Sequence, residues 1–189
     1  MTRRQLALRD SLMSHNAAPN ALAVYTVVML AHGDRYLLLH RSPAKKFMPD
    51  LWTGLGGSVE RHEFDDLRGS ALRELHEEAS IAEVDVTHFV LRRALLHARA
   101  GGPLTLLLYY TAEWPSEIAP PCTEGTLHWV TREQFDGLNI IDTTRPVLPL
   151  LADDLRRDPE GRAPVALGVA VHAGGKAHVV WGTAASLGG

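Results

Sequence analysis

The chain has 189 residues, of which 46% are hydrophobic, so it can form the core of one domain and is not globally disordered. Its formal net charge of −3 and pI near 6.3 give no basic excess, which argues against nonspecific binding to nucleic-acid polymers. Cys122 is the only cysteine, so no intrachain disulfide can form, as expected in a reducing cytoplasm.

Residues 1–20 carry three arginines and favour a short helix. This segment lacks the apolar core of a signal peptide, and no apolar run in the chain approaches the ~20 residues of a membrane span. We therefore expect a cytoplasmic protein that does not enter a membrane.

The first half of the chain predicts three strands and a helix. The β-branched apolar run 21–31 predicts a buried strand, and residues 36–40 predict the strand that returns after a turn. A loop over 42–50 and a short strand over 51–55 lead to a pair of glycines. Apolar residues recur with helical spacing over 65–79, where Asp65 and Asp66 suit the N-terminal cap and first turn.

The second half alternates strands and turns before a second helix. Strands are predicted over 84–96, 104–112 and 126–130, and a helix over 142–157 whose Pro149 argues for a late start. The last two predicted strands, 165–172 and 177–181, flank the hairpin signal Ala-Gly-Gly-Lys. Mixed strands with two main helices indicate an α/β or α+β fold, arranged as a helix–sheet–helix sandwich.

Three carboxylates gather on one face of the first predicted helix. Glu74, Glu77 and Glu78 are spaced i, i+3, i+4, within an arc of about 100°. Like charges at this spacing repel, and two of them lie near the helix C-terminus, where the macrodipole disfavours anions. A hard divalent cation reverses this cost, because Mg²⁺ prefers carboxylate oxygens and substrate phosphates. The pattern therefore favours metal-assisted phosphate chemistry.

These residues resemble the Nudix hydrolase family. Its motif is Gly, five residues, Glu, seven residues, then Arg-Glu-aliphatic-x-Glu-Glu-x-Gly-aliphatic. Gly57 and Glu63 match the first half, and residues 73–78 match the second half without a change. Nine residues separate Glu63 from Arg73, so either the loop is two residues longer or Asp65 takes the role of the first glutamate. Ser80 replaces the motif glycine.

The resemblance extends over about residues 21–155 and implies a fold and a domain division. The fold would be the Nudix-type α/β/α sandwich with a mixed β-sheet. The Nudix domain would span 21–157, preceded by a helical extension over 1–20. A C-terminal β-hairpin extension over 158–189 would pack on the same domain.

The resemblance also implies a metal site. Glu74 and Glu78 would bind Mg²⁺ or Mn²⁺ directly, Glu77 would bind another ion directly or through water, and the Gly56 carbonyl would add a backbone oxygen. Arg73 would orient the glutamates by pairing with Glu63 or Asp65, and Gly57 would support the turn.

The general base has two candidates, and each residue that could contact the substrate has two interpretations. Glu77 is one candidate for the base, and Glu124 is the other because related proteins use a loop carboxylate there. Trp52 and Phe47 either stack on a nucleobase or belong to the core. Asp142 either reads a purine edge or caps the second helix.

The implied reaction is cleavage of a pyrophosphate bond in a nucleoside diphosphate derivative. The favoured substrate is a nucleoside triphosphate such as 8-oxo-dGTP, giving monophosphate and pyrophosphate, because the segment 124–130 resembles MutT-type members. Dinucleoside polyphosphates and nucleotide sugars are alternatives.

A nucleotide sensor without turnover is a rival from another class. An isoprenoid isomerase is disfavoured because Cys122 lies far along the chain from the motif. Under the hydrolase and sensor hypotheses, the expected ligand is a small nucleotide. The added hairpin could pair with another subunit in a homodimer or cover the site.

Overall fold

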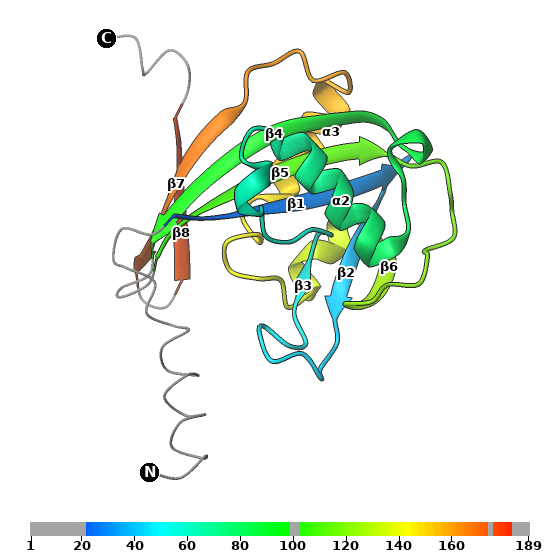
Figure 1. The fold of residues 1–189 in the computed structure, drawn as a ribbon, viewed down its shortest axis with the longest axis horizontal. Coiled ribbons are helices and arrows are strands. Elements are labelled where there is room, and N and C mark those ends of the chain that lie inside the picture. Colours follow the sequence, from blue (N-terminus) through cyan, green and yellow to red (C-terminus); the bar gives the residue numbers. More distant parts are fainter. Residues whose placement is uncertain (1–21, 99–102, 174–175, 183–189) are drawn as a thin grey trace.

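The computed structural model describes residues 22–98, 103–173 and 176–182. The fold is built on one mixed β-sheet (Figure 1). Its strands follow the order β3-β2-β1-β5-β4-β7-β8, and β6 pairs with β2 outside that path. β1 pairs with β5 and β4 pairs with β7 in parallel, whereas the other neighbours are antiparallel. The strands are β1 (Leu22–His32), β2 (Arg35–Arg41), β3 (Trp52–Thr53), β4 (Thr87–Ala98), β5 (Leu104–Glu113), β6 (Gly125–Thr131), β7 (Ala166–Ala173) and β8 (Lys176–Gly182).

Helices cover both faces of the sheet, which confirms the predicted sandwich. Helix α2 (Leu67–Ala79) crosses in front of β1 in Figure 1 and buries Ala71 and Leu75 against alternate residues of β1 and β2. Helix α3 (Leu148–Arg157) buries Leu148 and Leu151 against the opposite set. β1 therefore has apolar residues on both faces, which explains its continuous apolar run.

The two helices begin later than the sequence predicts. Helix α2 begins at Leu67 because the Asp66 carboxylate accepts the Gly69 N–H at 2.8 Å, so Asp66 is the cap. Asp65 lies before the cap and is exposed. Helix α3 begins at Leu148, with Pro149 in its first turn, where a proline removes no helical hydrogen bond.

The chain leaves α2 through Ser80 in a left-handed conformation with φ 55°. Its N–H donates to the His76 carbonyl at 2.8 Å. Serine thus takes the helix-ending position that usually favours glycine, at some cost in backbone strain. Ser80 therefore ends the helix in the conformation that the motif glycine would supply.

The predicted C-terminal hairpin is present as β7 and β8, and β7 lies beside β4 in the sheet. The helix predicted over residues 1–20 falls outside the described residues. Within the described parts of the chain, no helix has the length and apolar character needed to cross a membrane.

Candidate active site

The glycine turn brings the backbone against the carboxylates of α2. The Gly56 N–H donates to the Glu78 carboxylate at 2.8 Å. A Cβ atom on Gly56, whose φ is 134°, would lie 2.2 Å from the Thr26 carbonyl oxygen, and one on Gly57 would lie 2.5 Å from a Glu74 carboxylate oxygen. Gly56 therefore needs glycine, since a side chain there would be strained and would meet the backbone of β1, whereas a side chain on Gly57 would displace the Glu74 carboxylate.

Arg73 connects the carboxylates of this region. Its guanidinium lies 2.6 Å from Glu63, 2.9 Å from Glu74 and 3.0 Å from Glu77. It also donates to the Ser58 carbonyl at 3.1 Å. Of the two partners expected for Arg73, the structure brings Glu63 to it, so the longer loop before the helix preserves the motif's spatial arrangement.

Glu63 is held from several directions. Besides Arg73, it accepts hydrogen bonds from the Ser70 hydroxyl at 2.8 Å and the Glu60 N–H at 2.9 Å. The Arg73 hydrogen bond is the main cause that lowers the pKa of Glu63 to about 2. Glu63 is thus a fixed anion that sets the orientation of Arg73.

The surroundings of Glu78 disfavour the ionised form of its carboxyl group. Burial raises the pKa of Glu78 to about 7, and the charges of Glu74 and Glu124 act in the same direction. Burial also raises the pKa of Glu74, against the opposing effect of Arg73. A cation next to these two carboxylates would stabilise their ionised forms.

The donor chemistry fits a hard divalent cation, although the side chains are not gathered around one point. Among the described residues, no three histidine, cysteine or carboxylate side chains are placed to hold a metal ion. Glu74 and Glu77 turn toward Arg73, and Glu78 turns toward Gly56. Carboxylate oxygens beside a backbone turn are nevertheless the ligand type that Mg²⁺ takes.

Glu124 reaches the same region from the loop before β6. Its carboxylate lies 2.6 Å from the Lys45 ammonium and 3.6 Å from the Arg41 guanidinium. The neighbouring Thr123 N–H donates to the Glu78 carbonyl at 3.0 Å, which ties this loop to the end of α2. Lys45 and Arg41 were not singled out from the sequence, because only the β2–β6 register brings them to Glu124.

Trp52 belongs to a cluster of rings on the α3 side of the sheet. It stacks on His40 with a centroid distance of 4.7 Å and lies 5.2 Å from His128. Phe47 is 69% exposed and stands apart on the loop before β3. The two histidines carry no sequence motif, and only strand pairing places them beside Trp52.

Asp142 follows Ile141, whose N–H donates to the Trp52 carbonyl at 3.0 Å. It is exposed and does not cap α3, whose N-cap position is Val147, so the expectation that it caps this helix is wrong. It borders a hollow together with Arg145, Pro146 and Ala177 of β8. The C-terminal hairpin thus reaches the side of the sheet that carries the ring cluster.

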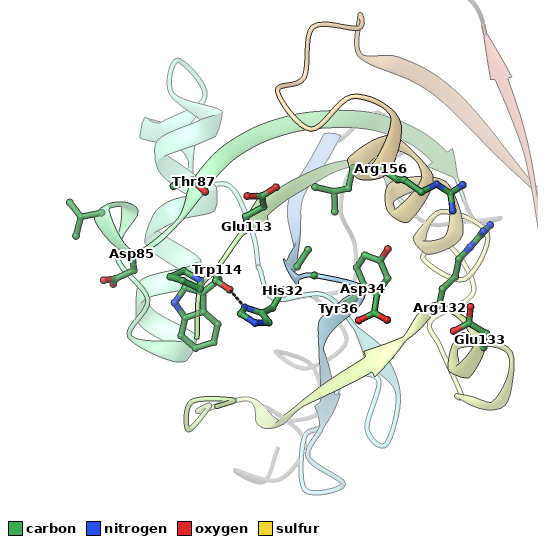
Figure 2. Close-up of a pocket in the computed structure, with 15 residues that line it drawn as sticks. His32, Asp34, Tyr36, Asp85, Thr87, Glu113, Trp114, Arg132, Glu133 and Arg156 are labelled. Carbon is green, nitrogen blue, oxygen red and sulfur yellow. Dashed lines mark hydrogen bonds between the residues drawn. The ribbon is translucent and has the colours of Figure 1, made fainter. Parts of the chain in front are cut away.

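A second hollow, of about 800 Å³, lies where β1 and β5 end (Figure 2). Its lining includes His32, Trp114 and Arg156 and, among the described residues, none of the carboxylates on α2. Arg132 and Arg156 both pair with Asp153, at 3.3 and 2.9 Å. The hollow in Figure 2 therefore lacks the carboxylate set that lies beside the glycine turn.

A family model, described as NUDIX domain, matches residues 19–151. The chain belongs to the NUDIX family. The resemblance of residues 57–78 to the Nudix motif is thereby confirmed, and so is the expectation of a hydrolase that acts on phosphorus-containing anhydrides. The matched range ends within α3, before the hairpin of β7 and β8.

Solved structures share this Nudix fold at low sequence identity. A MutT protein from Bacillus halodurans is 14% identical with a TM-score of 0.58, covering 84% of this chain and 97% of its own. A MutT NUDIX hydrolase from Burkholderia pseudomallei is 24% identical with a TM-score of 0.54, covering 68% and 97%. An Ap4A hydrolase from C. elegans is 19% identical with a TM-score of 0.55, covering 71% and 97%. No curated protein matches the sequence.

Proposed function

We propose that this protein is a Mg²⁺-dependent pyrophosphohydrolase of a nucleoside diphosphate derivative, with a nucleoside triphosphate such as 8-oxo-dGTP as the first candidate. The observation that carries the proposal is the site itself. A carboxylate-bearing helix meets a glycine turn, and one arginine links three glutamates at 2.6 to 3.0 Å.

Glu74, Glu77 and Glu78 would hold the metal, with the Gly56 carbonyl as a backbone ligand, and Mn²⁺ suits the same donors. The bound ion neutralises phosphate oxygens and lowers the pKa of a coordinated water. Arg73, fixed by Glu63, keeps the glutamates oriented. Asp65 is not needed for this role, since Glu63 already supplies it.

The general base is either Glu77 or Glu124. Glu77 is 59% exposed and lies 3.0 Å from Arg73. Glu124 is 26% exposed and lies beside Lys45. Glu124→Gln separates them, because Glu124 is not among the proposed metal ligands: a large fall in kcat with little change in KM would make Glu124 the base, and an unchanged kcat would leave Glu77.

The ring cluster of His40, Trp52 and His128 supplies an aromatic surface for the nucleobase, and Asp142 is the nearest candidate for reading its polar edge. Trp52 lies in β3, and the chain reaches Gly56 four residues later. Because the rings lie on the α3 side of the sheet and the glycine turn meets α2 on the other, a substrate that contacts both would have to pass around the β3 edge. Phe47, exposed on the preceding loop, is a second stacking candidate.

Dinucleoside polyphosphates are the second substrate class, since the Ap4A hydrolase from C. elegans has the same fold. Nucleotide sugars are the third. The rival function is a nucleotide sensor without turnover. The complete carboxylate set on α2 favours the enzyme, because a binding module has no need to retain it. A cytoplasmic location, consistent with the single Cys122, belongs to the same proposal.

The test is product release from a panel of nucleoside triphosphates, including 8-oxo-dGTP, dinucleoside polyphosphates and nucleotide sugars, with Mg²⁺ or Mn²⁺. Wild type should turn over at least one substrate, and Glu77→Gln should lose that turnover. The second product, pyrophosphate or orthophosphate, locates the cleaved bond. Tight nucleotide binding without turnover in both proteins would contradict the enzyme and support the sensor.

A further inference from the structure

The two-stranded C-terminal hairpin turns its larger apolar side chains outward. Leu167, Val169 and Val171 of β7 are 48%, 46% and 58% exposed. The residues between them, Gly168 and Ala170, are buried. A solvated sheet face normally carries polar residues at the outward positions, so this inverted pattern indicates that something covers the outer face.

These side chains continue an apolar row across the sheet. The strand register aligns Val24, Leu106, Leu96, Val169 and Val180 on neighbouring strands from β1 to β8. Val24 is 5% exposed near α2, whereas Val180 is 70% exposed on β8. The row is thus buried at its β1 end, in the core cluster that includes α2, and exposed at its β8 end.

The hairpin's opposite side is anchored to the protein. Val179 and Trp181 of β8 pack against the core on the α3 side. The Arg93 guanidinium lies 4.9 Å from the Trp181 ring centroid, and Arg93 is itself paired with Asp154 at 2.7 Å. The exposed apolar row is therefore held in place by a packed structure beneath it.

β8 also ends the sheet. Among the described strands it pairs only with β7, so its outer backbone edge has no strand beside it. Exposed apolar edge strands are templates for pairing with another chain. A strand that pairs at this edge would extend the sheet without covering the apolar row, so the row needs a partner packed against its face.

We propose that a second copy of this chain covers this surface, which we call the hairpin face: Leu22, Leu96, Leu104, Leu106, Leu167, Val169, Val171 and Val180. All eight side chains are uncharged, and the exposed His178, the cross-strand partner of Val171, lies at the rim of the face, so another apolar face matches its centre. A two-fold axis parallel to the face would supply that match, because it stacks the two apolar rows on each other in a self-complementary contact. The proposal is independent of the hydrolase activity.

The available area suits such a dimer. Side chains of this size and exposure offer on the order of 500 Å² of apolar surface per protomer, at the upper end for a monomer's largest patch. Two such faces packed together, with the side chains around them, reach the ~1,200 Å² at which specific interfaces begin.

The test is the oligomeric state of the full chain by sedimentation velocity from about 1 to 100 μM. Wild type should be a dimer at the upper concentrations. Val180→Lys and Val169→Lys should each weaken association by roughly 100-fold or more, because each copy would bury an unpaired charge. Both sites are exposed, so circular dichroism and the melting temperature of the monomer should stay near those of wild type.

Val84→Lys is the matched control, since Val84 is 92% exposed in the turn before β4, away from the hairpin. It should leave the dimer intact. A wild-type monomer at 100 μM, or a dimer that survives both hairpin variants, would overturn the proposal. If wild type is a monomer and a variant lacking residues 1–20 dimerises through Val180, the face belongs to that segment instead.

Discussion

Arg73 decides how the carboxylates of α2 are presented, and Glu63 decides where Arg73 lies. The Glu63 carboxylate receives two hydrogen bonds from Arg73, at 2.6 and 3.0 Å, and a third from Ser70. Asp65, the other acid that could fill this role by spacing, is exposed. The two acids therefore form a matched pair for mutagenesis.

Glu63→Gln should lower kcat by about 10- to 100-fold, the usual effect of removing a group that orients metal ligands. Asp65→Asn should leave kcat unchanged. Equal losses in both variants would show that Glu63 has no special role. Steady-state kinetics with the best substrate from the panel decides between these results.

The lowered pKa of Glu63 predicts a stability effect in acid. Since its folded pKa of about 2 lies below the ordinary value of 4.5, the ionised carboxylate stabilises the fold above pH 4.5. That contribution, about 1–3 kcal/mol, should be lost as the pH falls from 4.5 toward 2. Urea unfolding should show a smaller decline over this range in Glu63→Gln.

Glu78 should behave in the opposite sense. Its folded pKa of about 7 exceeds the ordinary 4.5, so the folded protein binds more protons between these values, and stability falls as the pH rises through them. Without divalent cations, Glu78→Gln should gain about 1–3 kcal/mol at pH 8 relative to wild type. Thermal melts with EDTA at pH 5 and pH 8 measure this difference.

Adding Mg²⁺ at pH 8 should raise the melting temperature of wild type more than that of Glu78→Gln, because ion binding to the folded state stabilises it. An equal rise in both proteins would contradict a ligand role for Glu78. This readout needs no substrate, so it tests the metal site separately from the reaction.

At the scale of elements, the contact between the glycine turn and α2 places the site. Gly57→Ala would put a methyl group within about 2.5 Å of the Glu74 carboxylate, which must then move. We expect kcat to fall by about 10-fold or more with little change in unfolding free energy, since a side-chain carboxylate can yield more easily than backbone. Gly137→Ala meets no atom within 4 Å and serves as the control in the same assays.

At the scale of the whole molecule, Arg92 joins the sheet to the segment that leads into the C-terminal hairpin. It lies in β4, is 7% exposed, and donates to the carbonyls of Asp158 and Pro159 at 2.6 and 2.9 Å and to the Thr111 hydroxyl at 2.8 Å. These bonds satisfy a buried cation and fix the chain where α3 ends.

Arg92→Met should lower the free energy of unfolding by about 2–4 kcal/mol, because the buried Thr111 hydroxyl and two partly buried carbonyls lose their donor. Arg157→Ala, at an exposed site on α3, should change it by less than about 0.5 kcal/mol. Chemical denaturation compares the three proteins. A change in Arg92→Met no larger than that of the control would show that these bonds add little to stability.

The sequence by itself determined the family, the sandwich and the carboxylate face of α2. These depend on local patterns: alternating or continuous apolar runs for strands, helical spacing for α2, and a motif contained within residues 57–78. The late start of α3 also has a local signal, since Pro149 is tolerated only in the first turn of a helix.

Only the tertiary structure decided which residues meet. Lys45 and Glu124 are 79 positions apart, and His40 meets Trp52 and His128 through the pairing of β2 with β3 and β6. Glu63 and not Asp65 meets Arg73 because of how the loop before α2 folds. The exposure of the hairpin face depended on how far the packing of α2 extends over the sheet. Such contacts follow from strand register and packing, which one chain's local pattern does not specify.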